Sequence, residues 1–227
     1  MSGSGVQISL QQFKEVLLRL QNGEHAANIN LVTPTHYTPS IAAALGELRD
    51  SRVLTIPVVY NTSSFDSLEA LSLMRGKVDV YLADFKYASA LEAGKLSHAP
   101  RYPEIALAAI EEMVAQVPVW EEDDEGLLLK GVIVRHLVLP GRVEESKRAL
   151  ATLHDRFGGS VRLSIMSQYT PLASGLERYG LAGRVTEEEY EEVLDYADSL
   201  GVEDYFWQQG DAAQESFVPE FNGEGVR

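Results

Sequence analysis

The sequence predicts an α/β fold in which a mostly parallel sheet forms part of a (β/α) barrel. Short apolar, β-branched runs alternate along the chain with amphipathic helical segments. The runs are apolar at nearly every position, which is typical of parallel strands covered on at least one face by helices. About five such runs are present, too few for a closed eight-stranded barrel. No low-complexity linker divides residues 1–227, so we expect a single domain.

The first half of the chain opens with a helix. Leu10, Phe13 and Leu17 have helical spacing. Residues 54–60 form the most β-branched run of this half, and Ser64 is the expected N-cap of the helix that follows. The expected elements here are helix 8–22, strand 28–32, helix 39–49, strand 54–60, helix 64–74 and strand 78–83.

The second half carries the longest β-rich stretch, residues 127–139, which follows an acidic turn at 121–126. Thr186 and Glu189 have the spacing of a capping box, and Gly201 is placed to end that helix. We expect residues 1–7 to be disordered and the aromatic-rich tail, 202–227, to pack on the barrel. The remaining expected elements are helix 102–117, helix 144–157, strand 161–166 and helix 186–200.

Composition excludes several classes of function. The net charge of −15 argues against a protein that binds nucleic-acid backbones. The chain has no cysteine, so its residues cannot supply a disulfide, a thiolate zinc site or thiolate ligands for an iron–sulfur cluster. It has no apolar run of the ~20 residues that span a bilayer and no signal-peptide pattern at its start. We therefore expect a cytoplasmic protein without a membrane partner.

Polar residues follow the first three strands, where βα architectures carry their chemistry. The first loop offers Thr33, Thr35 and His36 for an anion, or simply caps the next helix. The second begins at Asn61 and suits hydroxyl or amide ligands, with capping as the alternative. Asp84 and Lys86 in the third are two residues apart, so in an extended segment both side chains point the same way. A weak surface ion pair is the alternative.

The last two strands add further candidates. Arg135 and His136 are neighbours in an apolar strand and face opposite sides, so at most one of them points into a barrel. The pattern leaves open which one does. Gln168 and Tyr169 follow the final expected strand and either line a site or form a plain turn.

Four strings at the expected strand ends resemble radical S-adenosylmethionine (radical SAM) proteins, most nearly the branch of pyruvate formate-lyase-activating enzymes. They are NINLVTPTHY (28–37), PVVYNTSSF (57–65), VDVYLADFKYAS (78–89) and GVIVRHLVLPG (131–141). The resemblance covers about residues 9–221. It implies a partial TIM-like (β/α) barrel, a [4Fe–4S] cluster held by Cys-x-x-x-Cys-x-x-Cys, bound S-adenosylmethionine and a glycyl-radical-type enzyme as protein substrate.

The resemblance also implies a set of cofactor-binding positions on the S-adenosylmethionine side of the site. Thr33–His36 corresponds to a Gly-Gly-Glu segment that holds the methionyl amine, but here the segment lacks a carboxylate. Asp84 and Lys86 would contact the ribose or the methionyl carboxylate. Arg135 or His136 would hold that carboxylate or line the substrate side. The implied cofactor-binding residues are Thr33, Thr35, His36, Asn61, Asp84, Lys86, Arg135, His136, Gln168 and Tyr169.

Three hypotheses follow from these observations. The chain is the distal part of a radical SAM enzyme whose first βα unit and cluster ligands lie upstream of Met1, and it is inactive alone. Alternatively, it is a cluster-less ligand-binding protein or scaffold on the same barrel. A third hypothesis is an unrelated barrel enzyme that uses Asp84, Lys86 and His136. Without a preceding strand, residues 28–32 would form an exposed sheet edge, which predicts self-association.

Overall fold

The computed structural model describes residues 7–171, 174–202 and 204–207, which form one sheet backed by a layer of helices. Six strands run parallel, each beside the next, and a short strand β4 (Glu121–Glu122) pairs antiparallel with β5. This sequential parallel order is that of a barrel wall, as the sequence predicts. The parallel strands are β1 (Ile29–Val32), β2 (Val58–Thr62), β3 (Val80–Asp84), β5 (Leu128–Leu137), β6 (Arg162–Met166) and β7 (Tyr205–Trp207).

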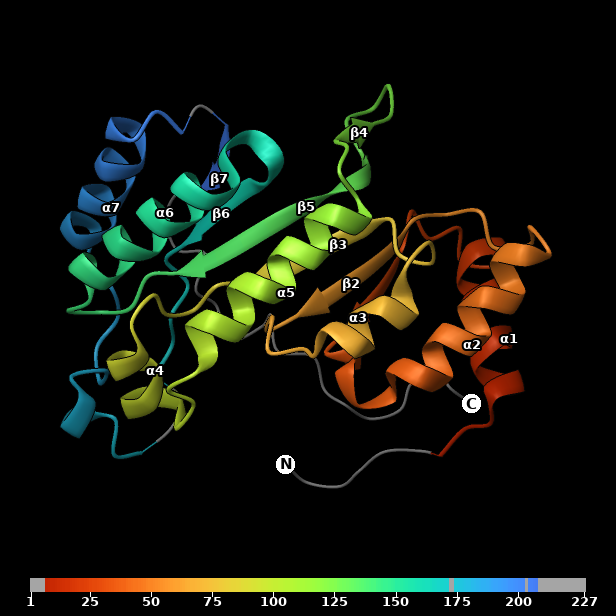
Figure 1. The fold of residues 1–227 in the computed structure, drawn as a ribbon, viewed down its shortest axis with the longest axis horizontal. Coiled ribbons are helices and arrows are strands. Elements are labelled where there is room, and N and C mark those ends of the chain that lie inside the picture. Colours follow the sequence, from red (N-terminus) through yellow and green to blue (C-terminus); the bar gives the residue numbers. More distant parts are fainter. Residues whose placement is uncertain (1–6, 172–173, 203, 208–227) are drawn as a thin grey trace.

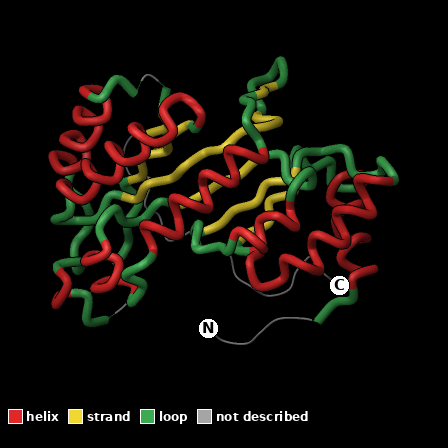
Figure 2. The backbone as a smooth tube through the Cα atoms, in the orientation of Figure 1, coloured by secondary structure: helices red, strands yellow, loops and turns green. Residues whose placement is uncertain are grey.

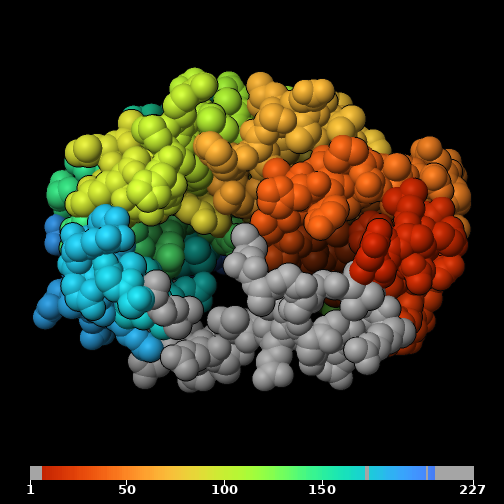
Figure 3. All heavy atoms as spheres, turned by 90° about the horizontal axis from the view of Figure 1, so that it is seen from below, coloured from red at the N-terminus to blue at the C-terminus, as the bar shows by residue number. Residues whose placement is uncertain are grey.

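The helices lie on one side of this sheet. In Figures 1 and 2 they run in front of the strands, and from below they form an arch with parts of β5 and β6, in green and teal, visible beneath it (Figure 3). The described part of the chain is therefore a curved, open sheet with one helix-covered face. The helices are α1 (Leu10–Asn22), α2 (Thr38–Asp50), α3 (Leu68–Met74), α4 (Ala90–Ser97), α5 (Tyr102–Gln116), α6 (Val143–Phe157) and α7 (Glu187–Ser199).

Alternation along each strand separates the two faces of the sheet. Tyr60, Val134 and Ile165 are fully buried in the core between sheet and helices. Their chain neighbours point to the other face, where Val32 is 67% exposed and Arg135 only partly buried. Burying the apolar helix-side residues provides the main drive to fold. The opposite face is left free to carry polar groups.

Two predicted boundaries were wrong in the second βα unit. Strand β2 begins at Val58 and ends at Thr62, because Pro57 has no N–H for the ladder and Val58 pairs with Ile29. Asn61 is therefore a strand residue. Helix α3 begins at Leu68 and is capped by Ser67, whose hydroxyl accepts from the Ala70 N–H at 3.1 Å. Ser64, the predicted cap, has a φ of 62° and a buried hydroxyl with no hydrogen-bond partner among the described residues.

The acidic turn predicted at 121–126 was wrong at its start, because Glu121 and Glu122 form strand β4 and pair with β5. Helix α4 and strand β7 were not predicted either, whereas the last helix matched the prediction. Helix α4 precedes α5 in the third crossover, and β7 adds a sixth parallel strand where only a packed tail was expected. The remainder of that tail, 208–227, and residues 1–6 lie outside the described residues. The capping box of Thr186 and Glu189 is confirmed, with both reciprocal hydrogen bonds present.

Strand β1 stands at one end of the strand order in the described sheet. The predicted self-association through it stays a prediction, which light scattering of the purified chain would test. Among the described residues, no helix is both long enough and apolar enough to cross a membrane.

Candidate functional site

Polar side chains from three neighbouring strands meet on the face that the helices leave open. The parallel register places Asp84 of β3 directly beside Arg135 of β5. Arg135 donates to Asp84 Oδ1 from Nε at 2.8 Å and lies 2.7 Å from the same oxygen through Nη2. Nη2 also donates to Asn61 Oδ1 of β2 at 2.7 Å. Lys86, just beyond β3, places Nζ 3.6 Å from Asp84 Oδ2. We call these four residues the strand-end cluster.

The strand-end cluster has more positive than negative charge. It contains two cations and one carboxylate, in a chain whose net charge is −15. Arg135 and Asp84 are about one-fifth exposed, whereas the Lys86 side chain is 45% exposed. Arg135 is held by its neighbours, whereas Lys86 has, among the described residues, one long ion-pair contact and a side chain that is nearly half exposed. The cluster can therefore attract an anionic group, which Lys86 is best placed to meet.

His136 lies on the other face of β5, which settles the orientation that the sequence left open. It is 2% exposed; Nδ1 is 2.8 Å from the Phe85 carbonyl and Nε2 is 3.0 Å from the Ser146 hydroxyl. Burial lowers the pKa of His136, which favours the neutral ring. Arg135 points to the open face and His136 to the helices. His136 is thus placed as a core residue, on the opposite side of β5 from Arg135.

The loop after β1 is joined to the cluster through the backbone. The Thr33 N–H donates to the Asn61 carbonyl at 2.8 Å, and Thr33 has a φ of 53°. Thr35 turns its hydroxyl toward Asp66, to which it donates at 2.8 Å. His36 is exposed. Of the three predicted residues in this loop, Thr33 is the one whose backbone hydrogen-bonds to a member of the strand-end cluster, Asn61.

Asp66 is a buried carboxylate that the sequence prediction missed. It is 2% exposed and accepts hydrogen bonds from three hydroxyls, those of Thr35, Tyr60 and Thr62. Burial, reinforced by the negative charge of Asp66, raises the pKa of Tyr60 to about 12. Asp66 anchors the loop after β1 to β2. The prediction placed it inside a helix, where its position one residue before the true N-cap could not be recognised.

The two residues predicted after β6 lie in the loop that follows this strand. The Tyr169 hydroxyl donates to the Leu181 carbonyl at 2.9 Å, which ties two loop segments together. Burial raises the pKa of Tyr169. The Gln168 side chain is exposed, and its amide nitrogen lies 3.6 Å from Met166 Sδ. These contacts do not bring either residue to the strand-end cluster.

Tyr102 is a second residue that the sequence prediction missed. It is the first residue of α5 and is 4% exposed. Its hydroxyl lies 2.9 Å from the Asp84 carbonyl and 3.0 Å from the Ser63 carbonyl, and it accepts from the Lys86 N–H at 3.0 Å. The sequence identified Tyr102 as the start of a helix, but no local pattern reveals which backbone groups a helix terminus will meet.

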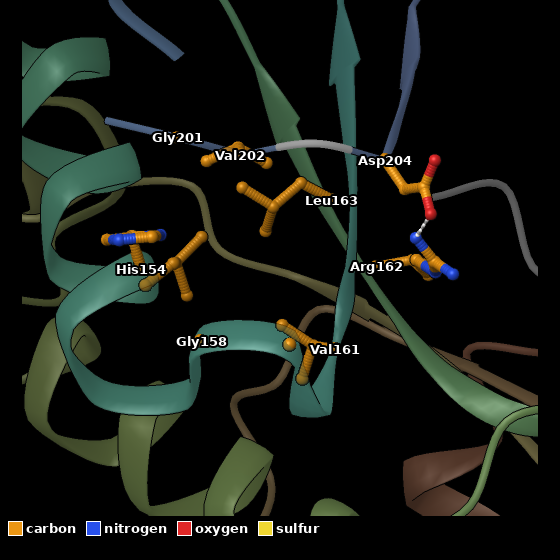
Figure 4. Close-up of a pocket in the computed structure, with 10 residues that line it drawn as sticks. His154, Gly158, Val161, Arg162, Leu163, Gly201, Val202 and Asp204 are labelled. Carbon is orange, nitrogen blue, oxygen red and sulfur yellow. Dashed lines mark ion pairs between the residues drawn. The ribbon is translucent and has the colours of Figure 1, made fainter. Parts of the chain in front are cut away.

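A hollow of about 350 Å³ lies at the other end of the sheet (Figure 4). It is formed where α6 turns into β6 and where α7 leads to β7. Arg162 at its rim forms an ion pair with Asp204, so that cation is already matched. The hollow contains none of the predicted site residues. The strand-end cluster, at the carboxyl ends, remains the candidate site.

Comparisons with known proteins place the fold. No protein-family model matches the chain. A radical SAM methyltransferase from Sphaerobacter thermophilus superposes with a TM-score of 0.57 at 12% identity, covering 89% of this chain and 59% of that one. The chain shares its partial-barrel α/β fold with that protein. At that identity the likeness concerns the fold and does not select the activating-enzyme branch.

A curated relative is similar in sequence. Uncharacterized protein MJ0674 of Methanocaldococcus jannaschii is 28% identical over 182 residues, which cover 79% of this chain and 48% of that protein. The chain thus spans about half the length of the curated relative that it matches.

The fold implies two bound groups, a [4Fe–4S] cluster and S-adenosylmethionine, and the residues of this chain suit the two to different degrees. A [4Fe–4S] cluster needs thiolate ligands, and the chain has no cysteine. Among the described residues, no group of three or more His, Asp or Glu is placed to hold a metal ion. These residues therefore do not fit the cluster. S-Adenosylmethionine fits better, because its carboxylate matches the exposed ammonium of Lys86.

Proposed function

We propose that this chain binds S-adenosylmethionine at the strand-end cluster. The observation that carries the proposal is the Asn61–Arg135–Asp84 network, which holds polar groups from three strands at the carboxyl ends of a radical SAM-type barrel. Such ends are where ligands bind in βα architectures. Bound S-adenosylmethionine would supply an activated sulfonium group, and the residues of the strand-end cluster would supply binding and orientation.

Lys86 receives the ligand carboxylate in this proposal. Within the part of the chain that the structure describes, its ammonium has one ion-pair contact, at 3.6 Å, and its side chain is nearly half exposed. Arg135 is held by Asp84 and Asn61, so it contributes its charge from a fixed position. Asp84 holds that arginine and balances one of the two cations. The positive excess of the strand-end cluster therefore favours a ligand with a carboxylate.

Calorimetry with S-adenosylmethionine tests the proposal. Lys86→Ala should weaken binding at least tenfold, because it removes the accessible cation. Lys95→Ala is the matched control, since its side chain is 44% exposed and also lies near a carboxylate, Glu92, at 3.9 Å. The proposal would be rejected if the wild-type chain did not bind S-adenosylmethionine, or if Lys86→Ala and Lys95→Ala bound it with equal affinity.

A further proposal concerns the activity of a longer protein that would contain this chain, by analogy with the relative of which it matches 48%. By resemblance, it would act as a radical SAM protein of the activating-enzyme type on a glycyl-radical-type protein, with cluster ligands supplied from outside these residues. This chain alone would then be inactive in radical chemistry. The test is to incubate the isolated chain with S-adenosylmethionine under reducing conditions and without any added iron-binding protein. Cleavage of S-adenosylmethionine would contradict that proposal.

A scaffold without a small-molecule ligand is the second candidate. The internal pairing of Arg135 with Asp84 and Asn61 favours it, since these groups satisfy each other without a ligand. The third hypothesis, a Schiff-base lysine, has less support. Lys86 is nearly half exposed, whereas a nucleophilic lysine needs desolvation.

A further inference from the structure

The turns after β2 and β3 are joined by a single hydroxyl. The last pair in the β2–β3 ladder is Thr62 with Ala83. Beyond it, the Phe85 N–H donates to the Arg135 carbonyl of β5, which leaves the Asp84 carbonyl facing away from that strand. The Tyr102 hydroxyl lies 2.9 Å from this carbonyl and 3.0 Å from that of Ser63. It therefore continues the β2–β3 connection by one step where the backbone ladder has ended.

The same hydroxyl also fixes the start of the segment that carries Lys86. It accepts the Lys86 N–H at 3.0 Å, so one oxygen contacts the backbone on both sides of Phe85. The hydroxyl has one proton to donate, to either carbonyl, and a lone pair for this N–H. Burial raises the pKa of Tyr102, which keeps the group protonated and able to donate.

The ring of Tyr102 is held by aromatic side chains from the two turns that its hydroxyl joins. Phe65, after β2, stacks on it with ring centroids 6.0 Å apart. Phe85 and Tyr87, after β3, lie at 6.4 and 5.7 Å. Aromatic pairs at such separations add to the stability that burial alone provides. The hydroxyl is thus set in a fixed place relative to both turns.

We infer that Tyr102 is a positioning residue for the proposed ligand site. It acts through the backbone of Asp84 and Lys86, and it sets where their side chains stand relative to Asn61. The inference rests on the proposed function, because the consequence of correct positioning is affinity for the carboxylate-bearing part of S-adenosylmethionine. The Tyr102 hydroxyl contacts backbone groups rather than the side chains of the strand-end cluster.

Tyr102→Phe removes the hydroxyl and keeps the ring. The matched control is Tyr81→Phe: Tyr81 is fully buried, and its hydroxyl donates to Gln116 Oε1 at 2.7 Å, at the other end of α5. Both variants delete one buried hydroxyl that ties the sheet to the same helix. They differ in which end of the sheet they affect.

The test compares two ligands by calorimetry. S-Adenosylmethionine carries the amino-acid part, and 5′-methylthioadenosine lacks it. We expect Tyr102→Phe to weaken S-adenosylmethionine about tenfold and 5′-methylthioadenosine less than twofold, with Tyr81→Phe leaving both within twofold. A mere loss of folded protein would weaken both ligands alike. Equal losses for the two ligands, or equal behaviour of the two variants, would overturn the inference.

Hydrogen exchange separates failure of this inference from failure of the proposed function. If the wild-type chain binds no S-adenosylmethionine, the proposed function is wrong. The rate of hydrogen exchange at the Lys86 amide then tests whether Tyr102 positions this segment. Faster exchange confined to residues 63–65 and 84–87 in Tyr102→Phe, and absent from Tyr81→Phe, would support it. Unchanged exchange there, or faster exchange across the whole sheet, would reject it.

Discussion

Arg135 and Asp84 stand opposite each other across the β3–β5 pair, and two nitrogens of the guanidinium approach a single carboxylate oxygen. This leaves the other oxygen of Asp84 facing Lys86 at 3.6 Å. The carboxylate therefore lies between two cations, one held and one accessible. Its removal would leave both of them without a counter-charge.

Asp84→Asn should destabilise the fold by about 1–2 kcal/mol, because it leaves the partly buried Arg135 without its counter-charge. The partial exposure of both side chains keeps the cost below that of a fully buried pair. Urea unfolding measures the change. Glu111→Gln is the control: its partner, Arg156, and Glu111 itself are 44% and 64% exposed, so its loss should cost under about 0.5 kcal/mol. Equal costs for the two variants would contradict the burial difference.

His136 should make the fold less stable in mild acid. Its pKa in the folded state is lowered by burial from the ordinary value of 6.5, so the unfolded chain binds the proton more readily. The stability from the neutral ring is complete above pH 6.5 and declines as the pH falls below it, until the folded-state pKa is passed. Urea unfolding between about pH 5 and 8 measures this slope. In His136→Gln the free energy of unfolding should vary less steeply with pH. An unchanged slope would show that groups other than His136 cause the pH dependence.

Thr35→Val should release the loop after β1. The variant keeps the shape of the side chain but removes one of the three hydroxyls that donate to Asp66, at a cost of about 1 kcal/mol. Amide exchange in residues 33–37 should rise more than elsewhere. Thr55→Val is the control, because Thr55 is exposed and its hydroxyl contact, with Gln21, is 3.3 Å long. Equal effects in the two variants would show that Asp66 does not anchor this loop.

The fold could be predicted because it follows from local pattern. Apolar runs and helical spacing gave the order of strands and helices, and the Thr186–Glu189 box marked its helix start correctly. The errors arose where tertiary contacts override pattern. Strand β2 was placed early because Leu54 and Ile56 are apolar, yet pairing with β1 starts at Val58. Strand β7 was missed because three residues are too few to show a period.

The candidate site was harder to predict than the fold. Asp84, Lys86 and Arg135 were identified because charged residues at strand ends are conspicuous, and the structure brings them together. The orientation of Arg135 and His136 depends on which side the helices cover, and sequence alternation alone is symmetric in that respect. Tyr102 contacts groups 16 to 39 residues away, so no local signal distinguishes it from an ordinary helix-start residue. Asp66 has two nearby partners on β2 and a distant one, Thr35, but the sequence does not show that these hydroxyls turn toward it.

Gly131→Ala should disturb the start of β5 through a steric contact. A Cβ at Gly131 would stand 2.7 Å from Cε3 of Trp120, which packs over this position. The indole cannot move away freely, because the Arg162 guanidinium lies 5.2 Å from its ring centre and its N–H donates to Glu122 at 2.7 Å. Overpacking of this kind costs about 1–3 kcal/mol.

Thermal and urea unfolding of Gly131→Ala and Gly159→Ala check this expectation. A Cβ at Gly159 would meet no heavy atom of the described residues within 4 Å, so its substitution should change stability by less than about 0.5 kcal/mol. Tryptophan fluorescence should shift only in Gly131→Ala, because only there does the indole have to move. If that variant were as stable as the control, with unchanged fluorescence, Trp120 would not be packed on Gly131 of β5 as described.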